Sequence, residues 1–337
     1  MTATLRLVSR SHGTRSSSRR EPLVIGLVNN MPDGALQTTE RQFGDLLRVA
    51  ANEYDIRLRL FSFPELIRGE AGRTYVSSNY EPIAELWNGE FDGLIVTGAE
   101  PRSPALTDEV YWSSLTHLVD WASATGTPTI WSCLAAHAAV LHLDGIQRCR
   151  LDQKISGVFR CIKSGDDPLV TGLPVSWRVP HSRHNTLDPE CLESAGYQIL
   201  SYSEEVGADT FVVRRQAAFV FFQGHPEYDA DALYREYRRD VGRYLAGSVD
   251  SYPDMPRGCF DDDTALVFAQ FRARAQRQRT RDLLEVFPAA DLSGRLAHGW
   301  RDTAGALYGN WLRAFVSRAS SDAMNGSAAA DVATPAP

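Results

Sequence analysis

The sequence lacks the features that define several large classes of protein. Only five of its 337 residues are cysteine, an odd number with no C-x-x-C pair to suggest zinc. Basic residues do not dominate, since 35 Lys and Arg face 42 Asp and Glu and the net charge is −7. No apolar run approaches the roughly 20 residues that span a bilayer. We therefore expect no nucleic-acid partner and no membrane, and we expect a location in the reducing cytoplasm.

The two ends of the chain are poor in residues that build a core. The first twenty residues carry five arginines and many serines but no apolar segment long enough for a secretory signal. The last nineteen residues are rich in Ala, Ser and Pro. We predict disordered tails at residues 1–21 and 319–337, an α/β domain over residues 22–250, and a helical C-terminal extension over residues 251–318 that packs on the same domain.

From residue 23 onward, apolar segments alternate with helical patterns. The run "LVIGLV" (residues 23–28) ends in the turn-like "NNMPDG" and leads into a helical stretch over residues 39–51. Segments suited to strands follow at residues 56–63, 91–98, 128–132, 196–203, 210–215 and 218–224, and helical patterns at residues 111–122, 134–143, 229–245 and 299–315. Continuous apolar strands that alternate with helices predict an α/β fold with a mostly parallel sheet and helices on both faces.

Cys133 stands where the apolar segment "PTIWS" meets a helical pattern. Ligands of a parallel sheet bind beyond the carboxyl ends of its strands. A nucleophile at such a turn is exposed at the sheet edge, and the backbone N–H of the next residue, Leu134, faces the position of an oxyanion. Because free cysteines commonly fill cores, the spacing alone leaves open whether Cys133 is a nucleophile or a structural residue.

The segment "GHPEYD" (residues 224–229) offers a base and an orienting carboxylate. His225 directly follows the apolar segment at residues 218–224, and Glu227 lies on the same side if the chain stays extended. A carboxylate in that position holds the imidazole in one tautomer. Cys133, His225 and Glu227, placed at the ends of separate strands, would together form an activated nucleophile.

Several motifs together resemble those of a known family. They are "FDGLIVTGA", "YW", "SCLAAHAAVLHLDGI", "K-x-x-GVF", "PHSR", "GHPEYD" and "EYRRD", in this order along residues 91–240. Their order and spacing resemble those of the homoserine O-acyltransferases, which are related to class I glutamine amidotransferases. An early "NNMPDGALQTTERQF" and a late "WRDTAGALYGNWL" extend the resemblance to residues 24–318. The resemblance implies a class I glutamine-amidotransferase-like α/β fold with a helical C-terminal extension.

The resemblance also implies an activity and roles for individual residues. Cys133 matches the cysteine that forms an acyl-thioester, His225 the general base and Glu227 its partner, while Lys154, Ser182 and Arg239 match the residues that contact the substrates. The implied reaction transfers an acyl group from acyl-CoA to homoserine, in methionine biosynthesis. The enzyme would need no metal or other cofactor, since acyl-CoA is a substrate, and it would be a homodimer.

This chain departs from the family pattern at positions that bear on the substrate. His137 stands where glutamine is usual, and an arginine-rich insertion over residues 256–290 has the composition of a solvated helical face. Acetyl-type members place a carboxylate after "TGAP", where this chain has Arg102, with Glu100 close by. A guanidinium there can pair with the distal carboxylate of a succinyl group, so we predict succinyl-CoA as the donor.

Other functions stay open at this stage. Acetyl-CoA as donor, or serine or another hydroxy-amino acid as acceptor, would need the same catalytic residues. A glutamine-amidotransferase-like hydrolase would use the same Cys, His and Glu, although such domains commonly carry glycine around the nucleophile. A catalytically idle relative is a further alternative, which rapid alkylation of Cys133 at neutral pH would contradict.

Overall fold

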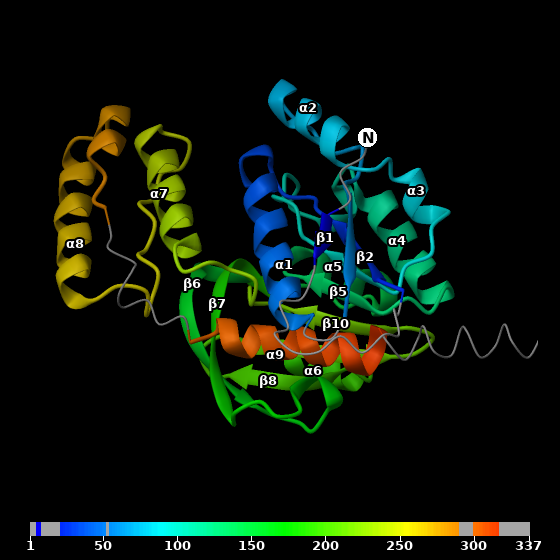
Figure 1. Cartoon of the computed structure of the whole chain (residues 1–337). Helices are drawn as coiled ribbons and strands as arrows, with labels where there is room; N and C mark the ends of the chain where they lie inside the picture. Colours follow the sequence, from blue (N-terminus) through cyan, green and yellow to red (C-terminus); the bar gives the residue numbers. More distant parts are fainter. Residues whose placement is uncertain (1–4, 8–20, 52–53, 290–298, 317–337) are drawn as a thin grey trace, which may run out of the picture.

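The computed structural model describes residues 5–7, 21–51, 54–289 and 299–316, arranged around one large sheet (Figure 1). The sheet has ten strands in the order β1-β3-β2-β4-β5-β10-β9-β8-β6-β7. Within the N-terminal tail, which the sequence predicts to be disordered, β1 (Leu5–Leu7) instead pairs with β3 in antiparallel direction. The rest of that tail up to residue 20 and the tail at residues 319–337 lie outside the described residues.

One half of the sheet is parallel and carries the apolar segments of the first part of the chain. Its strands are β3 (Ile56–Phe61), β2 (Leu23–Val28), β4 (Gly93–Val96), β5 (Thr129–Ser132) and β10 (Ala218–Phe222). Side chains along these strands alternate between two buried faces: Ile130 packs in one apolar cluster and Trp131 in the other. This burial on both sides explains the continuous apolar runs of the sequence.

The other half of the sheet is antiparallel and consists of β9 (Gly207–Arg214), β8 (Gln198–Ser203), β6 (Cys149–Lys163) and β7 (Ser176–Thr186). The α/β class is confirmed, but the sheet is mixed, because short connections rather than helical crossovers join most of these strands. The pattern of apolar residues does not predict β6 and β7. Many residues at the start of β6 are exposed or half-buried, and its pairing with β7 shifts register between Arg150 and Ile155.

Helices cover both faces of the sheet (Figure 1). On one face lie α1 (Leu36–Ala50), α2 (Glu70–Asn79) and α9 (Arg301–Trp311), which continues into a turn of π-helix at Leu312–Val316. On the other lie α3 (Ala84–Trp87), α4 (Trp112–Ala124), α5 (Leu134–Asp144) and α6 (Pro189–Ser194). The helix α9 packs against α1, so this late segment belongs to the same core as the early strands.

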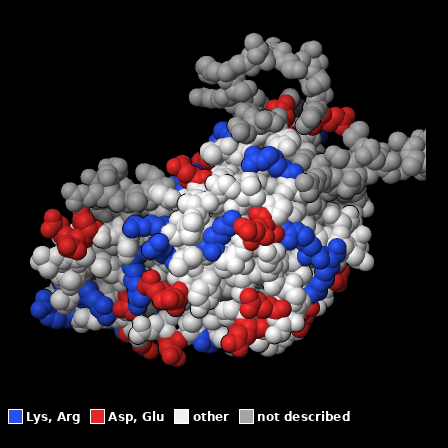
Figure 2. Space-filling view, turned by 90° about the horizontal axis from the view of Figure 1, so that it is seen from below, with Lys and Arg blue, Asp and Glu red and all other residues white. Residues whose placement is uncertain are grey.

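The arginine-rich segment forms a helix that packs beside the sheet domain. The helix α8 (Asp262–Arg277) lies against α7 (Ala232–Leu245), together with a 3-10 segment at Arg281–Val286 (Figure 1). Phe268, Phe271 and Ala275 face this small core, while Arg274 and Arg277 are exposed, as expected of a solvated helical face. Figure 2 shows acidic and basic side chains interspersed on the face seen from below.

The core contact of α9 yields a prediction about stability. Trp311 is fully buried, and a Cβ added at Gly93 of β4 would lie 2.9 Å from its ring. Trp311→Ala should lower the free energy of unfolding by about 3–5 kcal/mol, because it leaves a large cavity. Leu266→Ala, at a 59% exposed position of α8, is the matched control and should change it by less than about 0.5 kcal/mol. Urea unfolding measures both, and equal effects would show that α9 is peripheral.

Candidate active site

The turn from β5 into α5 holds Cys133 in a strained conformation. Its φ is 51° and its ψ −110°, and among the described residues it is the one non-glycine residue with a positive φ. The backbone N–H of Cys133 donates to the carbonyl of Phe222 at 2.7 Å, which ties the turn to the end of β10. A Cβ at Gly98 would lie 2.9 Å from Cβ of Leu134, so only glycine lets the neighbouring loop approach this closely. The sharp strand-to-helix turn predicted from the sequence is present.

His225 and Glu227 follow β10 and lie beside this turn. The imidazole Nδ1–H of His225 donates to Oε1 of Glu227 at 2.8 Å, and the charge of Cys133 acts on the same imidazole. The ring of Tyr228 stacks on the imidazole, with centroids 4.2 Å apart and planes 15° apart. The backbone N–H of His225 donates to the carbonyl of Pro180 in β7 at 2.8 Å. The structure thus brings together the three residues predicted to form the activated nucleophile.

Charge around the imidazole determines its protonation state. Burial lowers the pKa of His225, but the charges of Glu227 and Cys133 outweigh burial and raise the pKa well above its ordinary value of 6.5. A cationic imidazolium beside the Glu227 carboxylate is therefore the favoured state at neutral pH, and a positive charge next to a cysteine in general favours the thiolate form. A thiolate is the reactive form of cysteine, so this arrangement can perform nucleophilic chemistry.

A polar wall beside the thiol contains the three predicted substrate contacts. Lys154 of β6 donates from Nζ to Oδ2 of Asp240 at 2.8 Å, and Arg239 donates from Nε to Oδ1 of the same carboxylate at 3.0 Å. Ser182 of β7 donates to Oε2 of Glu236. Nζ of Lys154 lies 3.5 Å from that oxygen, so Lys154, Ser182 and Arg239 converge although they come from three elements.

Glu236 is the centre of this polar wall, and the sequence analysis gives it no role. Besides Ser182 and Lys154, the Tyr228 hydroxyl donates to its Oε1 at 2.5 Å. Burial raises the pKa of Glu236, but the charges of Lys154 and Arg239 lower it by more. The pKa therefore lies below its ordinary value, and the carboxylate stays ionised. The one sequence feature that could have indicated Glu236 is its i, i+3 spacing from Arg239 on α7. Such pairs are common on exposed helices, so the spacing alone does not predict a site residue.

Comparison with known proteins places this site in a family. The family model for homoserine O-succinyltransferase matches residues 7–321. A homoserine O-succinyltransferase of Rhodopseudomonas palustris is 48% identical over 303 residues, which cover 90% of this chain and 91% of the relative. One of Bradyrhizobium japonicum is 48% identical over 296 residues, covering 87% and 90%. The chain belongs to the homoserine O-succinyltransferase family. The predicted family is confirmed, and the chain is an acyltransferase.

A solved structure supports the fold assignment for this family member. A glutamine amidotransferase of Methylobacillus flagellatus superposes with a TM-score of 0.50 at 16% sequence identity, covering 87% of this chain and 94% of its own. The glutamine-amidotransferase-like fold is thereby confirmed, while its activity does not transfer at this identity. Among the helices that the structure describes, none is long and apolar enough to cross a membrane.

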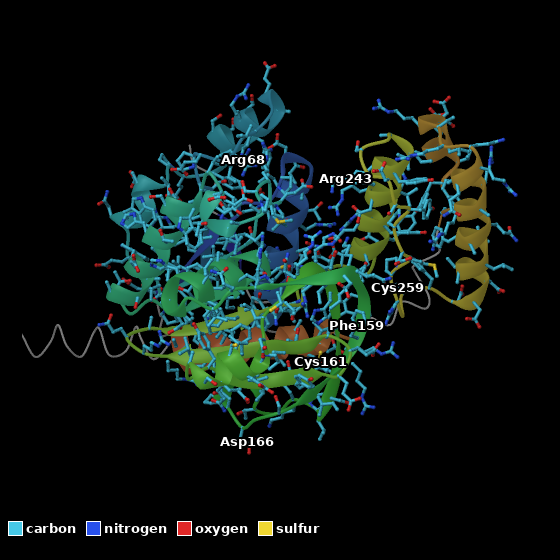
Figure 3. The ribbon with its side chains drawn as sticks, turned by 180° about the vertical axis from the view of Figure 1, so that it is seen from behind. Arg68, Phe159, Cys161, Asp166, Arg243 and Cys259 are labelled. Carbon is cyan, nitrogen blue, oxygen red and sulfur yellow. The ribbon has the colours of Figure 1, made fainter. Side chains whose placement is uncertain are left out.

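In this acyltransferase, the residues predicted to select the acyl group have partners of their own. Glu100 forms an ion pair with Arg243 of α7, which lies on the side of that helix facing the sheet domain (Figure 3). The exposed Arg102 donates from Nη2 to the carbonyl of Ile67 at 3.3 Å, and its backbone N–H donates to Glu109 at 2.7 Å. No hydrogen bond or ion pair within the described part of the chain joins either side chain to Cys133, so their role in donor selection stays a prediction.

The position of Leu134 agrees with its predicted role as the oxyanion donor. Leu134 is the first residue of α5, and the first N–H groups of a helix have no acceptor within it. The positive end of the helix dipole adds to the attraction for a developing negative charge. Leu134 therefore has the position that its predicted role requires.

The unusual His137 is structural. Its Nε2 is 2.9 Å from Oε1 of Gln223, and burial lowers its pKa to about 3, so it is neutral and donates this bond. Gln223 in turn donates to the carbonyl of Ala208 at 2.7 Å. The departure from the family pattern thus ties α5 to the residue that follows β10 and leaves the candidate triad in place.

A second buried cluster beneath the site has residue types that can bind a metal. Ligand atoms of Cys161, His181 and Asp209 lie within 4.8 Å of one another. Asp209 instead accepts hydrogen bonds from the hydroxyls of Ser201 and Thr210, each at 2.8 Å. Burial raises the pKa of the Cys161 thiol far above its usual range, which disfavours the thiolate that a metal would bind. We assign this cluster a structural role.

The charge on Glu227 yields a prediction for His225. Glu227→Gln should lower the pKa of His225, because the variant removes the nearby charge that outweighs burial. The imidazole would then lose its proton at lower pH in an NMR titration, and turnover should fall by about ten- to a hundredfold. Glu204→Gln, at an exposed position, is the control and should leave both unchanged. An unaltered His225 titration in Glu227→Gln would contradict the assignment.

Proposed function

We propose that this acyltransferase moves a succinyl group from succinyl-CoA to the hydroxyl of homoserine through a thioester on Cys133. The observation that supports the proposal most is that His225 lies between Cys133 and Glu227 at the edge of the sheet, hydrogen-bonded to the carboxylate. The names of the relatives at 48% identity supply the substrates, and they agree with the succinyl donor favoured by the sequence.

In the first half-reaction, the Cys133 thiolate attacks the thioester carbonyl of succinyl-CoA. The tetrahedral oxyanion forms near the N–H of Leu134, where the helix terminus stabilises it. The intermediate collapses with cleavage of the bond to CoA, and the His225 imidazolium protonates the departing CoA thiolate. The products are free CoA and a succinyl-thioester on Cys133.

Acylation prepares the second half-reaction by changing the charge beside His225. The Cys133 charge helps to raise the pKa of His225, and the thioester carries no such charge, so the pKa falls and the imidazole becomes a base. It takes the proton of the homoserine hydroxyl as the oxygen attacks the thioester. The thiolate leaves as O-succinylhomoserine forms, and the imidazolium beside it restores the starting state.

The polar wall has the charges needed to hold homoserine. An amino acid carries a carboxylate and an ammonium group, and Arg239 and Glu236 offer a guanidinium and an ionised carboxylate about one helical turn apart. Lys154 and Ser182 contribute donors between them. We assign the carboxylate of homoserine to Arg239 and its ammonium group to Glu236, which leaves the hydroxyl free to approach His225.

The proposal also covers the cellular compartment, the need for a cofactor and the oligomeric state. All five cysteines are free thiols, which supports a reducing compartment such as the cytoplasm. The reaction as written needs no cofactor, because Cys133 supplies the nucleophile and CoA the leaving group. A homodimer is proposed on the family resemblance alone.

The proposal is tested by looking for the acyl-enzyme. Intact-mass analysis after incubation with succinyl-CoA alone should show one succinyl adduct on the wild type and none on Cys133→Ser, because a serine hydroxyl needs far more activation than a thiol. Cys191→Ser is a matched control, since that thiol is exposed and lies on α6; it should keep the adduct. An adduct that persists in Cys133→Ser would place the nucleophile elsewhere.

A further inference from the structure

The proposed donor presents a chemical requirement that the triad and the polar wall do not meet. A succinyl group on Cys133 ends in a carboxylate a few bonds beyond the sulfur. A carboxylate that leaves water for a partly buried site needs a cation or several hydrogen-bond donors there. The following inference rests on the proposed function, and it concerns which residues supply that partner.

Most cations around the site already have a carboxylate partner. Lys154 and Arg239 share Asp240, at 2.8 and 3.0 Å. Arg243 of α7 pairs with Glu100 of the loop that follows β4. Lys154 and Arg239 already belong to the site assigned to homoserine, and Arg243 would have to release Glu100. The acyl end of the donor is therefore better matched by a cation that has no carboxylate partner.

Arg148 is such a cation. It precedes β6, follows α5 closely, and is half-buried. Its guanidinium donates from Nη2 to the carbonyl of Pro104 at 3.3 Å, and no carboxylate of the described residues lies within ion-pair distance of it. Pro104 belongs to the loop between β4 and α4, and the same loop approaches Leu134 at Gly98. The guanidinium therefore lies against the loop that borders the Cys133 turn, and the charge of Cys133 acts on it.

Tyr111 adds an unused donor at the same place. Its side chain is 2% exposed, yet its hydroxyl has no hydrogen-bond partner among the described residues. The ring is fixed by Phe63, with the two planes 12° apart. Burying a hydroxyl without a partner costs free energy, and an anion bound by Arg148 would offer this one an acceptor.

The remaining charges near Arg148 are compatible with an anion. Glu109 interacts with Arg148, but Oε1 of its carboxylate accepts the backbone N–H groups of Arg102 and Ser103, at 2.7 and 2.8 Å. Arg150 adds a second positive charge close by. Two guanidinium groups, those of Arg148 and Arg150, therefore contribute positive charge here. The one nearby carboxylate, that of Glu109, already accepts two backbone hydrogen bonds.

We propose that Arg148 binds the distal carboxylate of the succinyl group during acylation of Cys133, with the Tyr111 hydroxyl as a second donor. Arg148 and Tyr111 are then residues that determine donor specificity. Arg102 is the competing candidate from the sequence, but its side chain is exposed and directed to the carbonyl of Ile67. Arg183 is 4% exposed, and its guanidinium donates to the backbone carbonyls of Asn185 and Val206, within the core.

The test compares succinyl-CoA with butyryl-CoA, which has a methyl group in place of the distal carboxylate. Arg148→Gln should lower kcat/KM for succinyl-CoA by about ten- to a hundredfold, the value of a charge-assisted hydrogen bond, and leave kcat/KM for butyryl-CoA unchanged. Arg148→Lys should restore part of the loss. Tyr111→Phe keeps the ring packing and should show a smaller loss with the same selectivity. Arg102→Ala should leave the ratio of the two donors unchanged.

Two results would overturn the proposal. An equal loss for both donors in Arg148→Gln would mean that the guanidinium acts on Cys133 or on the fold, and a loss of succinyl preference confined to Arg102→Ala would return the role to Arg102. Both results presuppose a wild type that forms the succinyl adduct on Cys133. A wild type without that adduct contradicts the proposed function itself, so the two failures are distinguishable.

Discussion

The positive φ of Cys133 is the constraint on which the site depends. A residue other than glycine in this conformation costs about 1–3 kcal/mol, and it persists only where the surroundings determine it. Here the hydrogen bond to Phe222, the buried helix α5 and the close approach of Gly98 hold the turn. The same hydrogen bond fixes β5 beside β10, and His225 follows β10. The strained turn therefore delivers the thiol and its base to one edge of the sheet.

The mixed character of the sheet places the proposed nucleophile and the proposed acceptor site at one edge. The parallel half supplies Cys133 and His225, as in other α/β proteins. The antiparallel half extends past that edge and brings Lys154 and Ser182 to it, and the N–H of His225 is anchored on Pro180 of β7. Glu236 and Arg239 come from α7, which carries the arginine-rich helix α8 on its other side. The proposed acceptor site thus lies where β6, β7 and α7 meet.

Local sequence patterns could indicate Cys133, His225 and Glu227 as candidates, but not the residues that surround them. A small-residue turn between an apolar strand and a helix indicated Cys133, and the two-residue spacing of His225 and Glu227 indicated a base with its orienting group. Glu236 and Arg148 could not be found in this way, because their roles depend on residues distant in sequence, as in the pairing of Lys154 with Asp240 across 86 positions. The strand β6 was missed since polar residues and a register shift interrupt its alternation.

The central claim is that the succinyl group resides on the enzyme before homoserine binds. Isotope exchange between labelled CoA and succinyl-CoA, measured in the absence of homoserine, tests this most directly, because only an acyl-enzyme can return its succinyl group to a different CoA molecule. We predict that label enters succinyl-CoA with the wild-type enzyme and that Cys133→Ala abolishes the exchange. Exchange that occurs only after homoserine is added would contradict the claim, since it would mean that both substrates must bind before any acyl transfer.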